Sequence, residues 1–89
     1  MSMQERIAAR LTAAFDPTSL EVVDDSHRHA GHSGARPGGE THYSVRLISA
    51  AFAGKSRVQR HRLVYDALAA EIAGGVHALA IDARGPAET

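Results

Sequence analysis

The sequence predicts a small α+β domain with the element order α-β-β-α-β. Two segments repeat apolar residues every three or four positions, which is typical of amphipathic helices. Three other segments alternate apolar and polar residues, which is typical of strands with one covered face. With 89 residues the chain has room for one core and for a single domain over residues 1–89. We therefore expect a three-stranded mixed sheet with both helices on one face.

The first helix is predicted over residues 2–15. Its apolar positions recur every four residues and form one stripe, made by Met3, Ile7, Leu11 and Phe15. Ser2 and Glu5 have the spacing of a capping box, in which each side chain binds the other residue's backbone N–H. The helix should end at Asp16, because a residue that precedes a proline is disfavoured in the helical conformation.

Residues 20–26 and 41–49 predict two strands, each with alternating apolar and polar positions. Because the two strands are joined directly, we expect them to pair in antiparallel fashion. The segment between them, residues 27–40, is polar, rich in glycine and contains three histidines. It shows no periodic pattern, and a loop of this length in so small a domain is typically functional or flexible.

The second helix is predicted to begin at Ser56, which forms a second capping-box pair with Gln59. Its apolar stripe continues in steps of three and four residues and is made by Val58, His61, Tyr65, Leu68 and Ile72. The helix should end near Ala73, because Gly74 and Gly75 are typical residues after a helix C-terminus.

The third strand is predicted over residues 76–83, where apolar residues again alternate between two faces. It follows a helical crossover, so it should run parallel to the second strand. The remaining residues, 84–89, show no such pattern, and we expect them to fray.

The composition excludes several kinds of function. The chain has no cysteine, so it forms no disulfide, offers no thiolate to a metal and has no thiol nucleophile. Ten basic and ten acidic residues give a net charge of zero, which disfavours strong binding to nucleic acid or a membrane. No apolar run is long enough for a transmembrane helix, and we expect a soluble, cytoplasmic protein. We find neither a phosphate-binding loop nor a dinucleotide motif and do not expect an enzyme.

Three segments together resemble the BolA family: LEVVDDSHRHAGH, ETHYSVRLISAAFAGKSRVQRHRLVYDAL and GGVHALAI. The resemblance covers the chain from the first helix through Ile81. It implies the class II KH-like form of the α-β-β-α-β fold, which is related to nucleic-acid-binding domains. Those domains clamp the nucleic-acid backbone with a Gly-x-x-Gly loop between helices. The match here, residues 31–34, falls in the loop between two strands instead.

The resemblance also implies an iron–sulfur role. His77, in the word VHAL, matches the family's cluster-ligating histidine, although spacing alone favours a partly buried structural residue. The family's second ligand lies in the loop between the strands, where His29 matches best and His32 is the alternate. Family members are partners of monothiol glutaredoxins. We therefore expect a [2Fe–2S] cluster that is shared with a glutaredoxin cysteine and glutathione, and no cofactor in the isolated chain.

A basic cluster at the start of the second helix comprises Lys55, Arg57, Arg60 and Arg62. It is the best candidate for contact with a phosphate or an acidic partner, while a solvated helix face explains it about as well. We expect Arg57 and Arg60 to be exposed and His61 to pack in the core. In the family this helix has been proposed as a DNA-reading surface. The zero net charge favours only weak, salt-sensitive binding to DNA.

The sequence therefore predicts an accessory or regulatory protein for iron–sulfur clusters, with a role in iron homeostasis or cluster delivery. The first alternative is a DNA-binding transcriptional regulator that uses the basic cluster. The second alternative is an adapter that binds glutaredoxin without a cluster, through the sheet edge and the C-terminal strand. We expect the free chain to be a monomer or a weak dimer.

Overall fold

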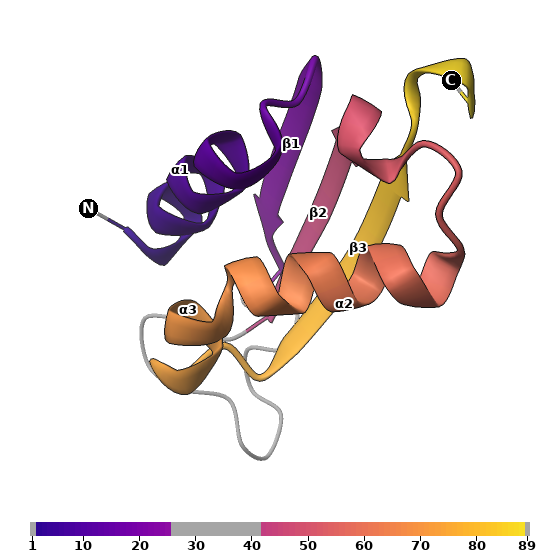
Figure 1. The fold of residues 1–89 in the computed structure, drawn as a ribbon. Helices are drawn as coiled ribbons and strands as arrows, with labels where there is room; N and C mark the ends of the chain where they lie inside the picture. Colours follow the sequence, from indigo (N-terminus) through magenta and orange to yellow (C-terminus); the bar gives the residue numbers. More distant parts are fainter. Residues whose placement is uncertain (1, 26–41, 89) are drawn as a thin grey trace.

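The computed structural model describes residues 2–25 and 42–88, whose fold is drawn in Figure 1. Its helices are α1 (Met3–Phe15), α2 (Arg57–Ala67) and α3 (Ala69–Ala73), and its strands are β1 (Ser19–Asp24), β2 (His42–Ile48) and β3 (Ala78–Arg84). The described residues also include two 3₁₀ turns, η2 (Ala50–Phe52) and η3 (Pro86–Glu88). No helix in the two described ranges has the length and apolar character needed to cross a membrane. The predicted element order is confirmed, with the second helix in two pieces.

The three strands form one mixed sheet in the order β1-β2-β3. β1 pairs with β2 in antiparallel fashion, with Val22 opposite Val45. β2 pairs with β3 in parallel fashion, with Val45 opposite Ile81. Both directions are as predicted, because a direct connection returns the chain antiparallel and a helical crossover returns it parallel.

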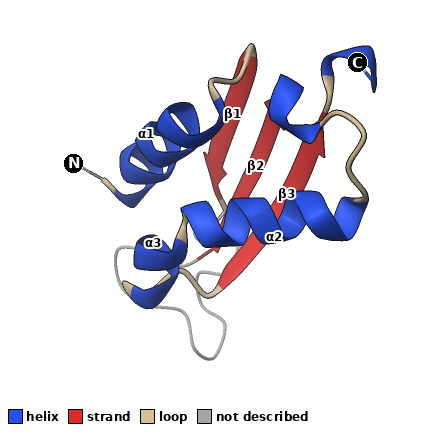
Figure 2. Ribbon diagram, viewed as in Figure 1, coloured by secondary structure: helices blue, strands red, loops and turns tan. Residues whose placement is uncertain are grey.

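The helices cover one face of this sheet, as Figure 2 shows. Tyr43, Val45 and Leu47 point toward the helices from the central strand and are at most 2% exposed, whereas Arg46 between them is exposed. The helices meet these residues with buried aliphatic side chains, chiefly Ile7, Leu11, Val64 and Leu68. The predicted α+β fold class, a mixed sheet covered by helices, is thus confirmed.

Both predicted capping boxes are present. The hydroxyl of Ser2 accepts a hydrogen bond from the N–H of Glu5 at 3.1 Å, and the N–H of Ser2 donates to the Glu5 carboxylate at 3.0 Å. Ser56 and Gln59 make the same two bonds at 3.2 and 2.8 Å. These bonds satisfy N–H groups that have no partner within the first helical turn, so they determine where α1 and α2 begin.

The buried face of α2 differs from the predicted stripe. That stripe includes Val58 and Tyr65, but the two side chains are 60% and 44% exposed. The buried residues are Val64 and Leu68, at 0% and 1% exposed. Leu68 belongs both to the predicted stripe and to the face that contains Val64. The spacing of apolar residues alone does not determine which of these two faces is buried. Packing against the sheet selects the face that buries Val64 and turns Arg60 toward β3.

A turn at Leu68 divides the predicted second helix into α2 and α3. The backbone of Leu68 has φ −102° and ψ 17°, which departs from helical values. Beyond this turn α3 lies beside α1, where Glu71 is buried. The Glu71 carboxylate pairs with Arg6 at 3.3 Å and with Arg10 at 3.5 Å. These two arginines compensate the burial of a charged group between the helices.

The C-terminal residues, expected to fray, are structured as far as Glu88. Arg84 closes β3, and its carbonyl accepts a hydrogen bond from the N–H of Ser49 at 2.9 Å. In η3 the N–H of Glu88 donates to the carbonyl of Gly85 at 3.1 Å. The turn is also held by Arg60, which lies 28 positions earlier in the chain. No local sequence pattern reports a contact over that distance, which is why we expected a frayed tail.

Candidate functional site

His77 lies at the end of the sheet where β3 begins. It is exposed and directly precedes Ala78. Ala78 pairs with His42, the first residue of β2, and the His42 carbonyl accepts a hydrogen bond from the N–H of Asp25 at 2.8 Å. Figure 1 shows β1 ending and β2 beginning close together. Both attachment points of the segment between these strands therefore lie at the same end of the sheet as His77.

The two predicted loop ligands, His29 and His32, lie outside the described residues. Within residues 2–25 and 42–88, no three histidine or carboxylate side chains gather in a way that could hold a metal ion. His77 offers one imidazole, whereas a [2Fe–2S] cluster takes four protein or small-molecule ligands. Residues 2–25 and 42–88 alone therefore do not supply enough ligands for such a cluster. The single imidazole of His77 fits a cluster whose other ligands come from elsewhere.

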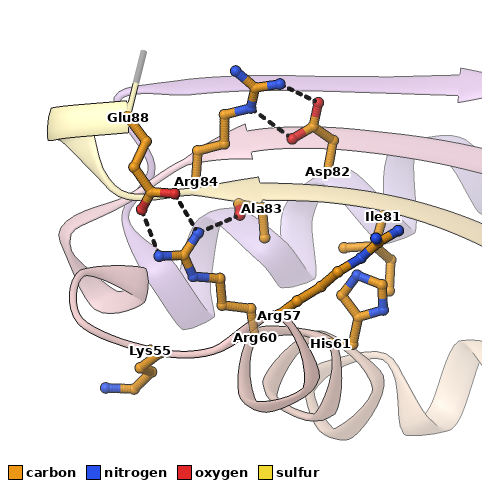
Figure 3. A pocket seen from close by; sticks show the side chains of 9 residues that line it. All are labelled: Lys55, Arg57, Arg60, His61, Ile81, Asp82, Ala83, Arg84 and Glu88. Atoms are coloured by element: carbon orange, nitrogen blue, oxygen red, sulfur yellow. Dashed lines mark hydrogen bonds and ion pairs between the residues drawn. The ribbon is translucent and has the colours of Figure 1, made fainter.

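A groove of about 680 Å³ runs between the start of α2 and the strand β3. Its lining residues are shown in Figure 3 and are Lys55, Arg57, Arg60, His61, Ile81, Asp82, Ala83, Arg84 and Glu88. Three members of the predicted basic cluster therefore share the groove, and Arg62 is not among its lining residues. Arg57 and His61 point toward β3, while Lys55 points away from it (Figure 3). His61 is half-buried in the wall of the groove. We expected it to pack in the core, and this expectation is wrong, because His61 is not among the core residues.

Arg60 occupies the groove in a way that the sequence did not predict. Its side chain is only 12% exposed, whereas we expected it on the solvent side. One guanidinium nitrogen donates to the carbonyl of Ala83 at 3.1 Å and to the Glu88 carboxylate at 2.8 Å, and the other donates to the second Glu88 oxygen. The expectation is wrong because a strand carbonyl and a carboxylate together offer the guanidinium more hydrogen bonds than α2 itself provides.

The ion pair between Arg60 and Glu88 changes the acidity of both groups. The hydrogen bonds from Arg60 lower the pKa of Glu88 below its usual range, and a bond from the backbone N–H of Gly85 lowers it further. The same pairing raises the pKa of Arg60. Both groups are therefore charged at neutral pH, so Glu88 neutralises the most enclosed cation of the groove.

A second carboxylate, Asp82, lies on the strand side of the groove. It accepts a hydrogen bond from Arg84 at 2.8 Å, and this bond lowers the pKa of Asp82. Arg46 on the neighbouring strand lies 3.7 Å away. These three side chains occupy alternate positions to the core residues of β2 and β3, so they belong to the uncovered face of the sheet.

Sequence reasoning missed the two acidic residues of the groove, Asp82 and Glu88. The basic cluster was visible because its members are close together in the sequence. Glu88 stands far from them, in a stretch without periodic pattern, and nothing in its neighbourhood signals a partner. The alternation within residues 76–83 places Asp82 on the face opposite Leu79 and Ile81, and this was the available signal that Asp82 lies outside the core.

Comparison with known proteins identifies the family. The chain belongs to the BolA-like protein family, whose family model matches residues 11–88. The SufE-like protein 1, chloroplastic/mitochondrial, of Arabidopsis thaliana is 51% identical over 87 residues, which are 93% of this chain and 24% of that protein. The DNA-binding transcriptional regulator BolA of Escherichia coli (strain K12) is 46% identical over 81 residues, 91% of this chain and 73% of that protein.

A solved structure supports the same assignment. The BolA domain of SufE1 from Arabidopsis thaliana matches with a TM-score of 0.89 and 49% sequence identity. The match covers 100% of this chain and 98% of that one. The family resemblance noted in the sequence is thereby confirmed over the whole fold, whereas the roles of individual residues rest on their chemistry.

Proposed function

We propose that the protein is an accessory or regulatory protein for iron–sulfur clusters, which binds a monothiol glutaredoxin and shares a [2Fe–2S] cluster with it. His77 supplies one ligand, and His29, or alternatively His32, supplies the second. A glutaredoxin cysteine and the thiol of glutathione supply the sulfur ligands that this chain lacks. The complex serves iron homeostasis or cluster delivery, and the chain performs no catalysis of its own.

The observation that carries this proposal is the position of His77. Its exposed imidazole stands where β3 begins, next to the paired residues Ala78 and His42. The segment with the other candidate ligands leaves the sheet at Asp25 and returns at His42, so it is attached beside His77. The attachment of this segment at the same end of the sheet as His77 supports the proposal that the two regions supply ligands to one cluster.

Ligation by imidazole has two chemical consequences. It raises the reduction potential of the cluster relative to ligation by thiolates alone. It also makes cluster binding depend on pH, because only the neutral imidazole can bind iron. Acidification should therefore weaken the binding of the shared cluster to this chain.

An anaerobic reconstitution tests the proposal. The chain is mixed with a monothiol glutaredoxin, glutathione, ferric iron and sulfide, and visible absorption and circular dichroism are recorded. We expect a cluster spectrum that differs from that of glutaredoxin alone and that changes when His77→Ala replaces the wild type. Parallel His29→Ala and His32→Ala variants identify the second ligand as the one whose loss changes the spectrum.

The matched control is His61→Ala. Its imidazole lines the groove beside α2 and is not among the proposed ligands. This variant should give the wild-type spectrum. A mixture whose spectrum equals that of glutaredoxin alone, or is unaffected by His77→Ala, contradicts the proposal.

A second candidate function is binding to DNA through the groove between the start of α2 and β3, the basic groove. The observation that favours it is the set of cations at the start of α2. The relative from Escherichia coli, a DNA-binding transcriptional regulator, supports the same function. Arg57 reaches across the groove and is exposed, so it is the residue best placed to contact a phosphate.

Fluorescence anisotropy with a labelled DNA duplex tests this second function. If it holds, the affinity falls steeply with salt concentration, because phosphate contacts release counterions. Arg57→Gln should weaken binding and reduce the salt dependence. The control is Arg46→Gln, which removes an exposed cation from the uncovered face of the sheet. Equal losses in the two variants would indicate non-specific attraction and contradict the assignment to the groove.

A further inference from the structure

The basic groove already contains an anionic group, supplied by the chain itself. Both oxygens of the Glu88 carboxylate accept hydrogen bonds from Arg60, and one also accepts from the N–H of Gly85 at 3.0 Å. A guanidinium that binds both oxygens is a common way for proteins to recognise a carboxylate. The Glu88 side chain is 46% exposed, so it can leave this position without disturbing the core.

The groove also runs along an edge of the sheet. β3 is the last strand of the described sheet. The carbonyl of Arg84 faces β2, because it accepts from Ser49. The N–H and C=O groups of successive residues in a strand point to opposite sides of that strand, so those of Ala83 and Ile81 point away from β2. The bond from Arg60 to the Ala83 carbonyl agrees with this direction. An extended peptide can pair with such an edge through its own backbone.

The charges of this groove favour a peptide over a nucleic acid. Asp82 lines the groove together with Arg57 and Arg60, and the whole chain has no net positive charge. A continuous phosphate backbone would place negative charge near Asp82 as well as near the arginines. An extended peptide presents a side chain toward one given face only at every second residue. It can therefore direct a carboxylate to Arg60 and pair its backbone with Ile81.

We propose that this groove binds an extended acidic peptide segment of a partner protein, with a carboxylate of the peptide replacing Glu88 on Arg60 and its backbone pairing with the edge of β3. Glu88 is then an internal competitor, and its displacement is part of binding. The groove shares no residue with the proposed cluster ligands. The peptide experiment can therefore fail while the cluster experiment succeeds, and the reverse.

Fluorescence anisotropy with a synthetic peptide of alternating glutamate and valine tests this inference. We expect Glu88→Gln to raise the affinity of the full chain for this peptide by about three- to tenfold, because the competing carboxylate is removed. Arg60→Gln should lower the affinity by about tenfold or more. Arg62→Gln is the matched control, because Arg62 does not line the groove, and it should leave the affinity unchanged. A peptide of alternating glutamine and valine should not bind.

Arg60→Gln also removes a contact that holds η3, so a second readout uses the wild-type protein. In ¹⁵N–¹H NMR spectra, the glutamate–valine peptide should shift the amide signals of Ile81 and Gly85. An unchanged affinity in Glu88→Gln, or unshifted signals at both amides on saturation, overturns the proposal. A labelled DNA duplex that binds more tightly than the peptide, and loses binding in Arg60→Gln, overturns it in favour of a nucleic-acid site.

Discussion

The Glu88 carboxylate neutralises Arg60, the most enclosed cation of the groove. Hydrogen bonds from Arg60 lower the pKa of Glu88, with a smaller contribution from Gly85. A carboxyl group whose pKa is lowered on folding stabilises the folded state at pH values above its unfolded pKa. That stabilisation is lost as the pH falls through the folded pKa. The turn η3 should therefore be attached to α2 at neutral pH and should detach in acid.

We predict that a carboxyl ¹³C NMR titration finds the pKa of Glu88 below the usual range for glutamate. Arg60→Gln should return this pKa toward the usual range, because the bonding guanidinium is gone. Asp82 is the internal control, since the pKa of its carboxyl is lowered chiefly by Arg84 and should stay low in the variant. The same Glu88 pKa in both proteins would show that the ion pair does not form.

Glu71 is a buried carboxylate with a structural role. It is 1% exposed, while its partners Arg6 and Arg10 are 45% and 56% exposed. A buried charge is costly when its partner is removed, whereas the two arginines are partly stabilised by water. The arginines of α1 therefore matter to stability mainly because α3 buries the opposite charge.

Arg6→Gln should lower the free energy of unfolding by about 1–2 kcal/mol, an amount already reduced for the solvent that reaches Arg6. In a Glu71→Gln background the same substitution should cost less than about 0.5 kcal/mol, because the buried charge is absent. Urea unfolding of the four proteins at neutral pH measures both values. Equal losses in the two backgrounds would mean that the pair is not coupled.

At the scale of elements, local signals predicted where helices start and stop. Ser2 with Glu5, and Ser56 with Gln59, formed the hydrogen bonds that their spacing indicates. α3 ends at Ala73, directly before the predicted glycine stop. Such signals involve residues three or four positions apart, so the chain needs no distant contact to use them.

The face that a helix buries depends on tertiary packing, and variants of α2 test which face is buried. Val64→Ala should lower the free energy of unfolding by about 2–3 kcal/mol, because it leaves a cavity in the core. Val58→Ala should change it by less than about 0.5 kcal/mol, since Val58 is 60% exposed. Chemical denaturation of the two variants distinguishes the observed face from the one predicted by apolar spacing. Equal losses would contradict the observed packing.

The whole molecule shows why the candidate sites were only partly predictable. Its fold follows from periodicity, caps and connection rules, all of which are visible in a single sequence. The basic residues of the groove were visible as well, because they are neighbours in the sequence. The pairing of Arg60 with Glu88 spans 28 positions, and that of Arg6 with Glu71 spans 65. Contacts of this kind depend on how the sheet and helices assemble, and no spacing rule reports them.

The sheet topology also places the two proposed sites at different parts of β3. His77 and the attachment points of the segment between β1 and β2 lie where β3 begins. The basic groove borders the later part of β3, from Ile81 onward. The proposed cluster ligands and the lining of the groove therefore have no residue in common.

The most direct test of the central claim is to detect nitrogen from this chain bound to the cluster iron. The chain is labelled with ¹⁵N-histidine, reconstituted with unlabelled glutaredoxin and glutathione, and reduced by one electron. Pulsed electron paramagnetic resonance then reports any coupling between the cluster and a directly bound ¹⁵N nucleus. We predict a strong ¹⁵N coupling that is reduced in His77→Ala and retained in His61→Ala. A reduced cluster without strong ¹⁵N coupling would contradict the proposal that this chain ligates it.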